Sequence, residues 1–229
     1  MPDLPKILPL GDNAITVDFG NVISLELNQR VISLAEHLTM NPFPGFVEAV
    51  PAYSSLAIFY DTLTTRAAFP ERESAFDAVR RIVSRIDVED ERSTESRLIE
   101  IPVDFGPNAA LDLSDVADLG GLSTKDVVEI FTNATYRVFM LGFLPGFAYM
   151  GEVDERIAAP RRQAPRLKVP KGSVGIAGRQ TGIYPLESPG GWQIIGRTDL
   201  ELFTPEAEEP CMLRPGDNVR FVRRDQLQN

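Results

Sequence analysis

Glycine and proline crowd one part of this 229-residue chain. Nine of the seventeen glycines fall between Gly142 and Gly191, and prolines are interleaved with them. Glycine permits close backbone approach and proline fixes φ, so such a stretch suits short strands joined by tight turns. Together with regularly spaced short apolar segments, it predicts a β-barrel or β-sandwich.

Charge is uneven in the same region. Between Arg156 and Leu186 there are seven cations and no acid, although the formal net charge of the chain is -10. We call residues 156–186 the cation strip and expect it to hold an anion. The plainer alternative is that glycines and prolines turn barrel corners while the cations form a solvated face. Turns alone do not require an acid-free strip, so the combined block favours a binding site.

Composition narrows the class of protein. With 43% hydrophobic and 24% charged residues, the chain resembles an ordinary globular protein. The negative net charge argues against general binding to nucleic acid or to anionic membranes. No apolar run approaches the roughly 18 residues of a membrane helix, and no signal-peptide pattern opens the chain. We therefore expect a cytoplasmic protein without membrane or nucleic-acid partners.

The first part of the chain has a mixed α+β pattern. Residues 14–19 alternate as in a half-buried strand. Ser24 can cap a helix whose apolar residues recur on one face through Leu38. Strands are expected at 46–50 and 55–60, and a second amphipathic helix from near Pro70. The order β-α-β-β-α predicts a small open sheet with helices on one face.

A charged stretch, Glu89 to Arg97, predicts a boundary between a domain at 1–92 and a domain at 93–229. In the second domain we expect two helices, near 114–119 and from 124 to 134, the latter capped by Ser123 and Asp126. The expected strands lie at residues 98–103, 136–143, 174–177, 182–184, 193–195, 201–203 and 218–222.

Familiar catalytic and binding motifs are mostly absent. The two helices resemble a helix-turn-helix, but the second offers only Lys125 against two acids, which disfavours DNA reading. His37 is the only histidine and lies in the first domain, and Cys211 is the only cysteine, so neither a metal cluster nor a histidine base in the second domain is expected. Any polar chemistry in the second domain must therefore come from groups that bind and stabilise charge, such as arginine, lysine and backbone N–H groups. A site of this kind is incomplete, and we call it a half-site because it needs residues from a partner protein.

Three segments carry a family resemblance. They are YRVFMLGFLPGFAYMG at 136–151, the block from APRRQAPRLKVPKGSVG to TDLELF at 159–203, and LRPGDNVRFV at 213–222. The chain resembles the B subunit of bacterial 5-oxoprolinase, also catalogued as allophanate hydrolase subunit 1 and related to a sporulation-kinase inhibitor, within the carboxyltransferase subdomain C/D group. The resemblance covers nearly the whole chain.

This resemblance implies a small α+β N-terminal domain followed by a mainly β, cyclophilin-like barrel. It implies an enzyme subunit that acts with a C-type subunit, and with an A-type subunit, in the ATP-dependent opening of the 5-oxoproline lactam to L-glutamate. The isolated chain is expected to be inactive. ATP could bind to this chain or to its partner.

The chain departs from the family pattern at two places. Where relatives usually have Tyr-Gly-Gly and then Gly-Pro-Asp-Leu, it has Phe105-Gly106-Pro107 and the residues 110–113 read ALDL. Where relatives usually have a histidine five residues before the strand tyrosine, it has Phe131 before Tyr136. Phenylalanine can neither donate, accept nor titrate, so a changed substrate or activity is one possible consequence.

The lactam chemistry suggests roles for the residues of the glycine-rich block. An amide carbonyl is a poor electrophile, and a phosphoryl group transferred from ATP would activate it, with cations and N–H donors stabilising the charge. Arg166, Lys171 and Arg197 are the candidate catalytic cations. The candidate substrate-binding residues are Phe143, Pro145, Gly146, Phe147, Ser173, Gln180, Thr181, Tyr184, Ser188, Gly190, Gly191 and Trp192.

Two other functions stay open beside the oxoprolinase subunit. One is a regulatory protein that inhibits a sensor histidine kinase. The other is a carboxyltransferase-like subunit that processes allophanate, urea or a related small amide. The sequence does not separate them.

Overall fold

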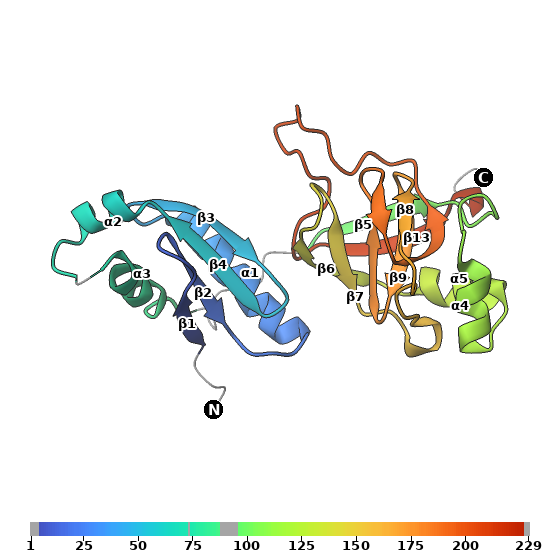
Figure 1. Cartoon of the computed structure of the whole chain (residues 1–229), viewed down its shortest axis with the longest axis horizontal. Coiled ribbons are helices and arrows are strands. Elements are labelled where there is room, and N and C mark those ends of the chain that lie inside the picture. Colours follow the sequence, from blue (N-terminus) through green and yellow to red (C-terminus); the bar gives the residue numbers. More distant parts are fainter. Residues whose placement is uncertain (1–4, 73, 88–95, 227–229) are drawn as a thin grey trace. The chain divides into compact units, whose positions relative to one another are not determined.

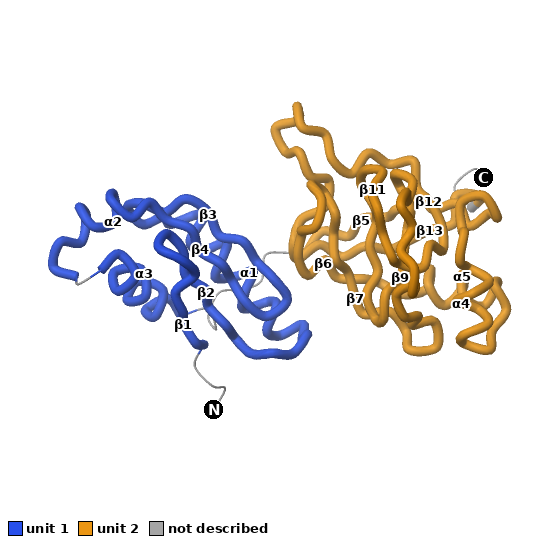
Figure 2. Tube along the Cα trace, viewed as in Figure 1, with its two compact units in different colours: residues 1–95 blue, residues 96–229 orange. Residues whose placement is uncertain are grey.

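The chain forms two compact units, Met1–Glu95 and Ser96–Asn229 (Figure 2). The computed structural model describes residues 5–72, 74–87 and 96–226. The boundary expected between residues 92 and 93 lies outside the described residues. Each unit has its own apolar core.

The first unit is built on a four-stranded antiparallel sheet (Figure 1). The strands are, in sheet order, β1 (Lys6–Pro9), β2 (Ala14–Asp18), β4 (Ser55–Tyr60) and β3 (Phe46–Pro51). The helices of this unit are α1 (Leu25–Met40), α2 (Thr62–Ala68) and α3 (Ala75–Val83).

One face of this sheet carries the core. Alternate residues of β4, namely Leu56, Ile58 and Tyr60, are buried in one cluster with residues of α1 and α3. Both helices therefore lie on the same face, as the element order predicts. The Ser24 hydroxyl accepts a hydrogen bond from the Leu27 N–H (3.3 Å), so the predicted cap of α1 is confirmed.

Two details of this unit differ from expectation. Strand β1 and helix α2 have no counterpart among the predicted elements, and α3 begins at Ala75 rather than near Pro70. Local caps explain the second difference. The Asp61 carboxylate accepts from the Thr64 N–H and starts α2, and the Ser74 hydroxyl accepts from the Asp77 N–H and starts α3.

The second unit contains a seven-stranded sheet in the order β12-β9-β10-β7-β6-β13-β5. Its strands are β5 (Leu98–Val103), β6 (Tyr136–Leu141), β7 (Ala148–Gly151), β9 (Ser173–Ala177), β10 (Gln180–Ile183), β12 (Gln193–Arg197) and β13 (Asn218–Arg223). A separate two-stranded ribbon pairs β8 (Arg166–Val169) with β11 (Ser188–Gly190). The short helices are α4 (Leu113–Gly120), α5 (Thr124–Asn133), η1 (Glu155–Ile157) and η2 (Arg224–Gln226).

The seven-stranded sheet is nearly closed into a barrel. Its edge strands β5 and β12 are joined by an isolated bridge in which Asp104 and Arg197 exchange both backbone hydrogen bonds (2.8 and 2.9 Å). Further along β12, the Asp112 N–H donates to the Ile194 carbonyl (2.7 Å). These contacts satisfy edge groups that an open sheet would leave unpaired.

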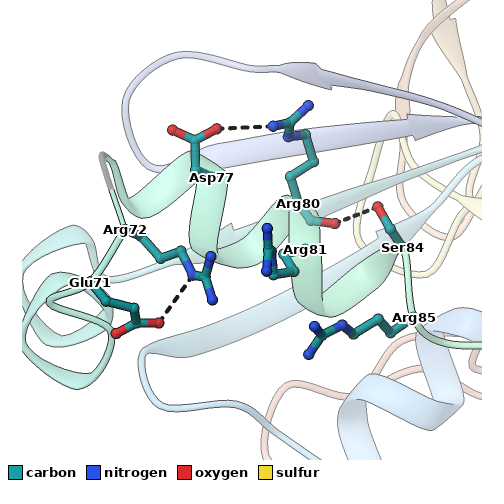
Figure 3. Close-up of a pocket in the computed structure, with 7 residues that line it drawn as sticks. All are labelled: Glu71, Arg72, Asp77, Arg80, Arg81, Ser84 and Arg85. Atoms are coloured by element: carbon teal, nitrogen blue, oxygen red, sulfur yellow. Dashed lines mark hydrogen bonds and ion pairs between the residues drawn. The ribbon is translucent and has the colours of Figure 1, made fainter.

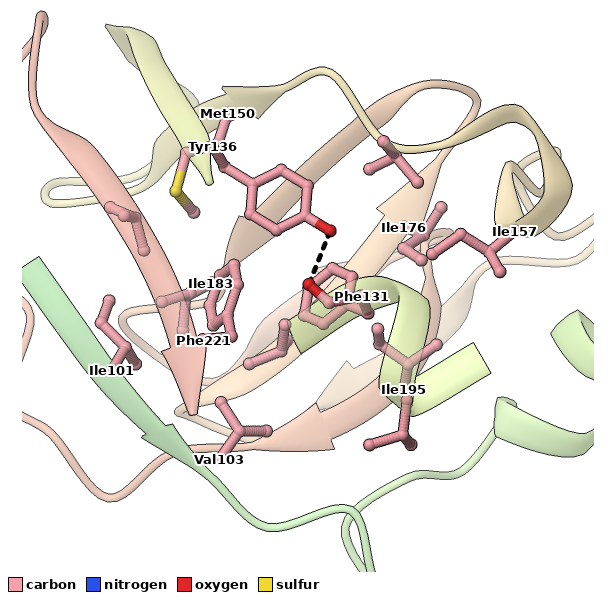
Figure 4. Close-up of a cluster of buried hydrophobic side chains, with 14 of the residues drawn as sticks. Ile101, Val103, Phe131, Tyr136, Met150, Ile157, Ile176, Ile183, Ile195 and Phe221 are labelled. Atoms are coloured by element: carbon pink, nitrogen blue, oxygen red, sulfur yellow. Dashed lines mark hydrogen bonds between the residues drawn. The ribbon is translucent and has the colours of Figure 1, made fainter. Parts of the chain in front are cut away.

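The barrel interior is apolar and receives side chains from α4 and α5 as well as from the strands (Figure 4). Phe131 of α5 is fully buried there and stacks on Phe221 with ring centroids 4.7 Å apart. The predicted capping box of α5 is present, since Ser123 and Asp126 each bind the other's backbone N–H. Helices 114–119 and 124–134 are thus confirmed to within a residue.

Some predicted strands differ. The expected strand at 201–203 is wrong, because Phe203 makes only an isolated bridge with Cys211. This segment instead packs against the turn at Gly146 (φ 80°), where a Cβ would lie 2.8 Å from that of Phe203. Strands β7, β8 and β11 were not expected. In the part of the chain that the structure describes, no helix has the length and apolar character required to cross a membrane.

Candidate functional site

A second, smaller core lies outside the barrel interior. Phe147, Tyr184 and Trp192 pack edge to face, with the ring of Phe147 5.3 Å from that of Tyr184 and 5.5 Å from that of Trp192. On β12, Ile195 belongs to the interior core and its neighbour Ile194 to this outer one. Alternate residues of the same strands therefore build both cores. We call this second core the outer aromatic cluster.

The GFLPGF turn places one partly exposed ring at the edge of this cluster, where Phe143 packs edge to face on Phe147 with ring centroids 5.5 Å apart. Phe143 is 60% exposed and has φ 70°, a conformation uncommon for residues other than glycine. The turn is held by a hydrogen bond from the Gly142 N–H to the Phe147 carbonyl (3.1 Å) and another from the Phe147 N–H to the Leu144 carbonyl (2.9 Å). Backbone strain of this kind is often found at functional sites, and here it presents an aromatic ring to solvent.

The ribbon of β8 and β11 covers the outer aromatic cluster. Val169 of β8 is fully buried in that cluster. Gly190 of β11 approaches Tyr184 so closely that any side chain there would collide with the phenol. Burial raises the pKa of Tyr184, although a backbone hydrogen bond from Trp192 and the nearby Arg161 and Arg166 lower it in part. Of the four aromatic residues among the substrate-binding candidates, Phe147, Tyr184 and Trp192 are thus buried packing residues and Phe143 is exposed.

A buried carboxylate organises the polar part of this region. Asp112 is 1% exposed and lies just before α4. Its oxygens accept hydrogen bonds from Arg162 Nη1 (2.6 Å), from both Nη atoms of Arg166 (2.8 and 2.6 Å) and from the Ile194 N–H (2.7 Å). The carboxylate therefore ties the loop before β8, the ribbon and β12 together. We call Asp112 with Arg162 and Arg166 the Asp112 hub.

The hub leaves two polar atoms without partners. Arg162 Nε and Gln193 Oε1 are buried and make no hydrogen bond to any residue that the structure describes. They lie close in the fold, because the Arg162 N–H donates to the Gly191 carbonyl (2.7 Å) and Gln193 Nε2 donates to the Pro160 carbonyl (3.0 Å). One buried donor without a described partner thus belongs to the hub itself, and one such acceptor belongs to the residue before Ile194, whereas both Nη atoms of Arg166 donate to Asp112.

The other two candidate cations, Lys171 and Arg197, lie near each other where the edge strands β5 and β12 meet. Ser173 pairs with Arg197 in the ladder of β9 and β12, and a Cβ at Gly172 would lie 3.4 Å from Arg197 Cγ. Lys171 Nζ contacts the Glu201 carboxylate at 2.6 Å. Arg197 is exposed, and its guanidinium has no ion pair with any described residue. Of the three candidate cations, Arg197 has the least compensated charge.

The cation strip is not a field of uncompensated positive charge. Six of its seven cations form ion pairs with acids that lie outside residues 156–186. The pairs are Arg156 with Asp154, Arg162 and Arg166 with Asp112, Lys168 with Glu187, Lys171 with Glu201, and Arg179 with Glu152 and Glu155. The sequence pattern failed here because acids directly outside the strip, such as Asp154, also pair with its cations, and because others, such as Asp112, come close only in the folded chain.

Several candidate binding residues have structural contacts. Thr181 is fully buried, and its hydroxyl donates to the Gly175 carbonyl (3.0 Å). It pairs with Ile176, which faces the barrel interior, so Thr181 lies away from the hub. The Ser188 hydroxyl donates to the Pro189 carbonyl (3.2 Å). The remaining candidates are Pro145 in the exposed turn, Ser173 in β9, Gln180 in β10 and Gly191 beside Arg162.

The two departures from the family pattern meet in space. Phe131 lies in the barrel interior, and the Tyr136 hydroxyl donates to its carbonyl (2.9 Å) (Figure 4). The ring of Phe105 contacts that of Phe131 edge to face, with centroids 6.4 Å apart. The two positions at which the sequence was interpreted as departing from the family pattern thus form an apolar pair. Phe131 has a packing role in this chain.

The described residues of this region supply guanidinium, hydroxyl and backbone N–H donors, which suit an anionic or amide group, and they include no histidine. His37, the single histidine of the sequence, lies in α1 of the first unit. Within residues 5–72, 74–87 and 96–226, no group of three or more His, Cys, Asp or Glu residues is arranged to hold a metal ion. Asp112 was missed at the sequence level, because nothing near it along the chain indicates that two arginines 50 and 54 residues away will contact it.

Sequence comparison places these features among known proteins. The family model of the carboxyltransferase domain, subdomain C and D, matches residues 5–213. The B subunit of 5-oxoprolinase from Bacillus subtilis is 44% identical and aligns over 95% of this chain and 92% of its own length. The corresponding protein of Escherichia coli O157:H7 is 43% identical over 93% of each chain.

Comparison with solved structures gives the same family relationship. The crystal structure of TTHA0988 matches with a TM-score of 0.80 and 40% identity over 92% of this chain, which spans 40% of that longer chain. A Pyrococcus horikoshii protein is 49% identical over 95% of this chain and 97% of its own, with a TM-score of 0.55. The urea carboxylase of Kluyveromyces lactis shares the fold, with a TM-score of 0.73 at 22% identity. The chain therefore belongs to the carboxyltransferase subdomain C and D family, alongside the B subunits of bacterial 5-oxoprolinase.

Proposed function

We propose that this chain is the B subunit of a multi-subunit, ATP-dependent 5-oxoprolinase that opens the 5-oxoproline lactam to L-glutamate. The observation that carries this proposal is near full-length similarity, since three bacterial B subunits are 34–44% identical over 93–95% of this chain. Similarity of this extent covers both units and the Asp112 hub.

The chemistry fits an incomplete site. ATP would supply the phosphoryl group that makes the amide carbon electrophilic. Arg197, whose guanidinium has no described ion pair, and Lys171, held by Glu201, are the cations placed to stabilise the developing negative charge or to bind the substrate carboxylate. Cations of this kind bind and stabilise negative charge, so the partner subunit would supply the acid and base. ATP would bind at the joint site or on the partner.

A partner also accounts for the apolar groups left in solvent on the second unit. Phe143, Leu167 and Leu186 are 60%, 87% and 38% exposed, and they lie on the turn, on β8 and just before β11 around the outer aromatic cluster. Exposed apolar groups around a strained turn are typical of an interface. We assign this face to a C-type subunit. An A-type subunit would complete the complex, which we expect in the cytoplasm.

Reconstitution tests the function. The chain should be purified alone and co-expressed with the C-type and A-type subunits, and ATP hydrolysis should be measured with and without 5-oxoproline. We expect 5-oxoproline-dependent hydrolysis only in the complex. Turnover by the isolated chain would contradict the half-site, and a complex that forms without any such turnover would overturn the proposed reaction.

Two matched pairs of variants test the assigned surfaces. Leu167→Glu should prevent co-purification with the C-type subunit, whereas Leu119→Glu, at a 60% exposed position on α4, should not. Arg197→Gln should lower turnover of the complex at least tenfold without changing the melting temperature, since a charged contact to substrate is worth more than 1 kcal/mol. Arg220→Gln, an exposed cation on β13, is the control.

A urea-processing function is the second candidate. The urea amidolyase of Lachancea kluyveri is 30% identical over 92% of this chain, which corresponds to 13% of that protein. Identity is lower than with the bacterial B subunits, so the lactam is preferred as substrate. Urea and allophanate belong in the same assay, and turnover of either in place of 5-oxoproline would reverse the preference.

A further inference from the structure

The first unit contains a hollow lined mainly by arginines. Its volume is about 610 Å³, and its lining residues come from α3 and from the segments on either side of it. Figure 3 shows Arg72, Arg81 and Arg85 directed toward the same space beside the helix. The lining residues are Glu71, Arg72, Asp77, Arg80, Arg81, Ser84 and Arg85. We call this hollow the arginine groove.

The charges in the groove are only partly balanced. Arg72 pairs with Glu71 (3.0 Å) and Arg80 with Asp77 (3.2 Å) (Figure 3). Arg81 and Arg85 are exposed and form no ion pair with an acid among the residues that the structure describes. Four arginines against two acids leave two positive charges in the described lining.

Helix stability does not account for this concentration. The buried face of α3 is formed by Ala75, Ala78, Val79 and Val83, and Arg80 lies over the ring of Phe76. Arg81 lies in the last turn of α3, where a cation complements the helix dipole, but Arg85 lies beyond the end of the helix. Neither Arg81 nor Arg85 pairs with a described acid, so ion pairing does not explain their position.

The clustering of arginines in the groove is also unexpected from the composition of the first unit, which is acidic overall. Residues 1–95 contain 15 acids and 8 arginines or lysines. Half of those cations line one groove. A random scatter of solvated cations over an acidic surface would lie next to acids instead, as Asp77 and Arg80 do.

We propose that the arginine groove binds a compact phosphate-bearing polyanion, with Arg81 and Arg85 as its main contacts. Guanidinium groups present paired N–H donors that match phosphate oxygens. The volume lies in the range of small-molecule sites, and the two uncompensated charges match a ligand with two or more negative charges. The described lining of the groove comes from the first unit, whereas the Asp112 hub belongs to the second unit.

Titration with inorganic pyrophosphate tests the site on the full chain. Binding should be measured by calorimetry at two salt concentrations and mapped by amide chemical shifts. We expect saturable binding that weakens with salt, with shift changes at residues 71–85. Arg81→Gln with Arg85→Gln should weaken binding at least tenfold, since both charged contacts are lost. No binding, or equal binding by this double variant, would overturn the proposal.

Control variants and control ligands distinguish binding at the arginine groove from a non-specific effect of net charge. Lys125→Gln with Arg220→Gln removes the same charge from exposed positions of the second unit and should leave the affinity unchanged. Equal weakening by this pair would overturn the site in favour of a net-charge effect. A hexaglutamate peptide, or vesicles of phosphatidylcholine with phosphatidic acid, should bind less tightly than pyrophosphate. A preference for the peptide or the vesicles would overturn the assignment to a free phosphate compound.

Discussion

Arginines gather at two places in this chain, and the two places differ in what surrounds the charge. At the Asp112 hub, Arg162 and Arg166 meet a carboxylate that is 1% exposed. In the arginine groove, acids occur in the same segment of sequence, yet Arg81 and Arg85 pair with none of the described acids. Arginines from an acid-free stretch of sequence thus pair with an acid from elsewhere in the fold, while Arg81 and Arg85, from a stretch that contains acids, pair with none of the described acids. Charge along a chain is therefore a poor guide to charge in space.

The largest expected loss of unfolding free energy comes from removing the carboxylate of the Asp112 hub. Asp112→Ala removes the acceptor of four hydrogen bonds and leaves the partly buried Arg166 without a described counter-charge and Arg162 with only the exposed Asp115. Breaking a buried ion pair in this way costs about 3–5 kcal/mol. Denaturant unfolding of the second unit, followed by the fluorescence of Trp192, measures the loss.

Asp115→Ala is the matched control for the hub. Asp115 lies three residues further on, is 60% exposed and is 4.0 Å from Arg162 Nη1. An exposed pair is worth less than about 1 kcal/mol. Equal losses in the two variants would show that burial does not distinguish the hub from surface charge.

A smaller loss of unfolding free energy is expected from placing a polar ring in the apolar barrel interior, where no hydrogen-bond partner is arranged for it. Phe131→His should cost on the order of 1–3 kcal/mol, because the barrel interior offers no arranged partner of the kind that Asp112 has. It should not raise 5-oxoproline-dependent turnover of the reconstituted complex. A gain in turnover would show that the histidine has a catalytic role even on this scaffold.

The contact between the two departures makes this prediction sharper. In the double variant Phe105→Tyr with Phe131→His, a phenol can approach the imidazole, so the losses should not add. Contacting positions couple by about 0.5–3 kcal/mol. Additive losses in the double-mutant cycle would mean that the two positions act independently.

The smallest effect concerns an exposed acid. Hydrogen bonds from the Ser123 side chain and backbone lower the pKa of Asp126 from its ordinary 3.8. Its contribution to stability is therefore present above pH 3.8 and is lost as pH falls through the lower folded-state pKa. The difference in unfolding free energy between the wild type and Asp126→Asn should shrink over that interval. A difference independent of pH would exclude the ionised cap.

Local signals explain which parts of the fold could be predicted. Helix α5 and the start of α1 were placed because their caps lie within three residues of the first turn. Strands β2, β4, β5 and β13 were placed because alternation or apolar runs mark them. The ribbon strands β8 and β11 were missed because proline, glycine and charge interrupt any such pattern.

The candidate site was less predictable because its organisation is long-range. Tyr184 and Trp192, both candidates for substrate binding, lie in one cluster, and their burial depends on the ribbon that covers them. The partner of Arg166 lies 54 residues earlier in a loop without a motif. The contact of Phe105 with Phe131 likewise joins a loop to a helix. Such contacts are set by the tertiary fold and leave no trace in neighbouring residues.

The position of β13 has a consequence for how the second unit comes to be folded. This strand lies between β5 and β6, and it is the ladder partner of β5 over all six residues from Asn218 to Arg223. During synthesis, β5 emerges more than a hundred residues before that partner and must wait with unpaired backbone groups. Closure of the barrel is thus a late, long-range event, which slows folding and exposes a strand edge meanwhile. Ribosome-bound chains that stop short of Asn218 are the form in which this unit is most open to aggregation or to a chaperone.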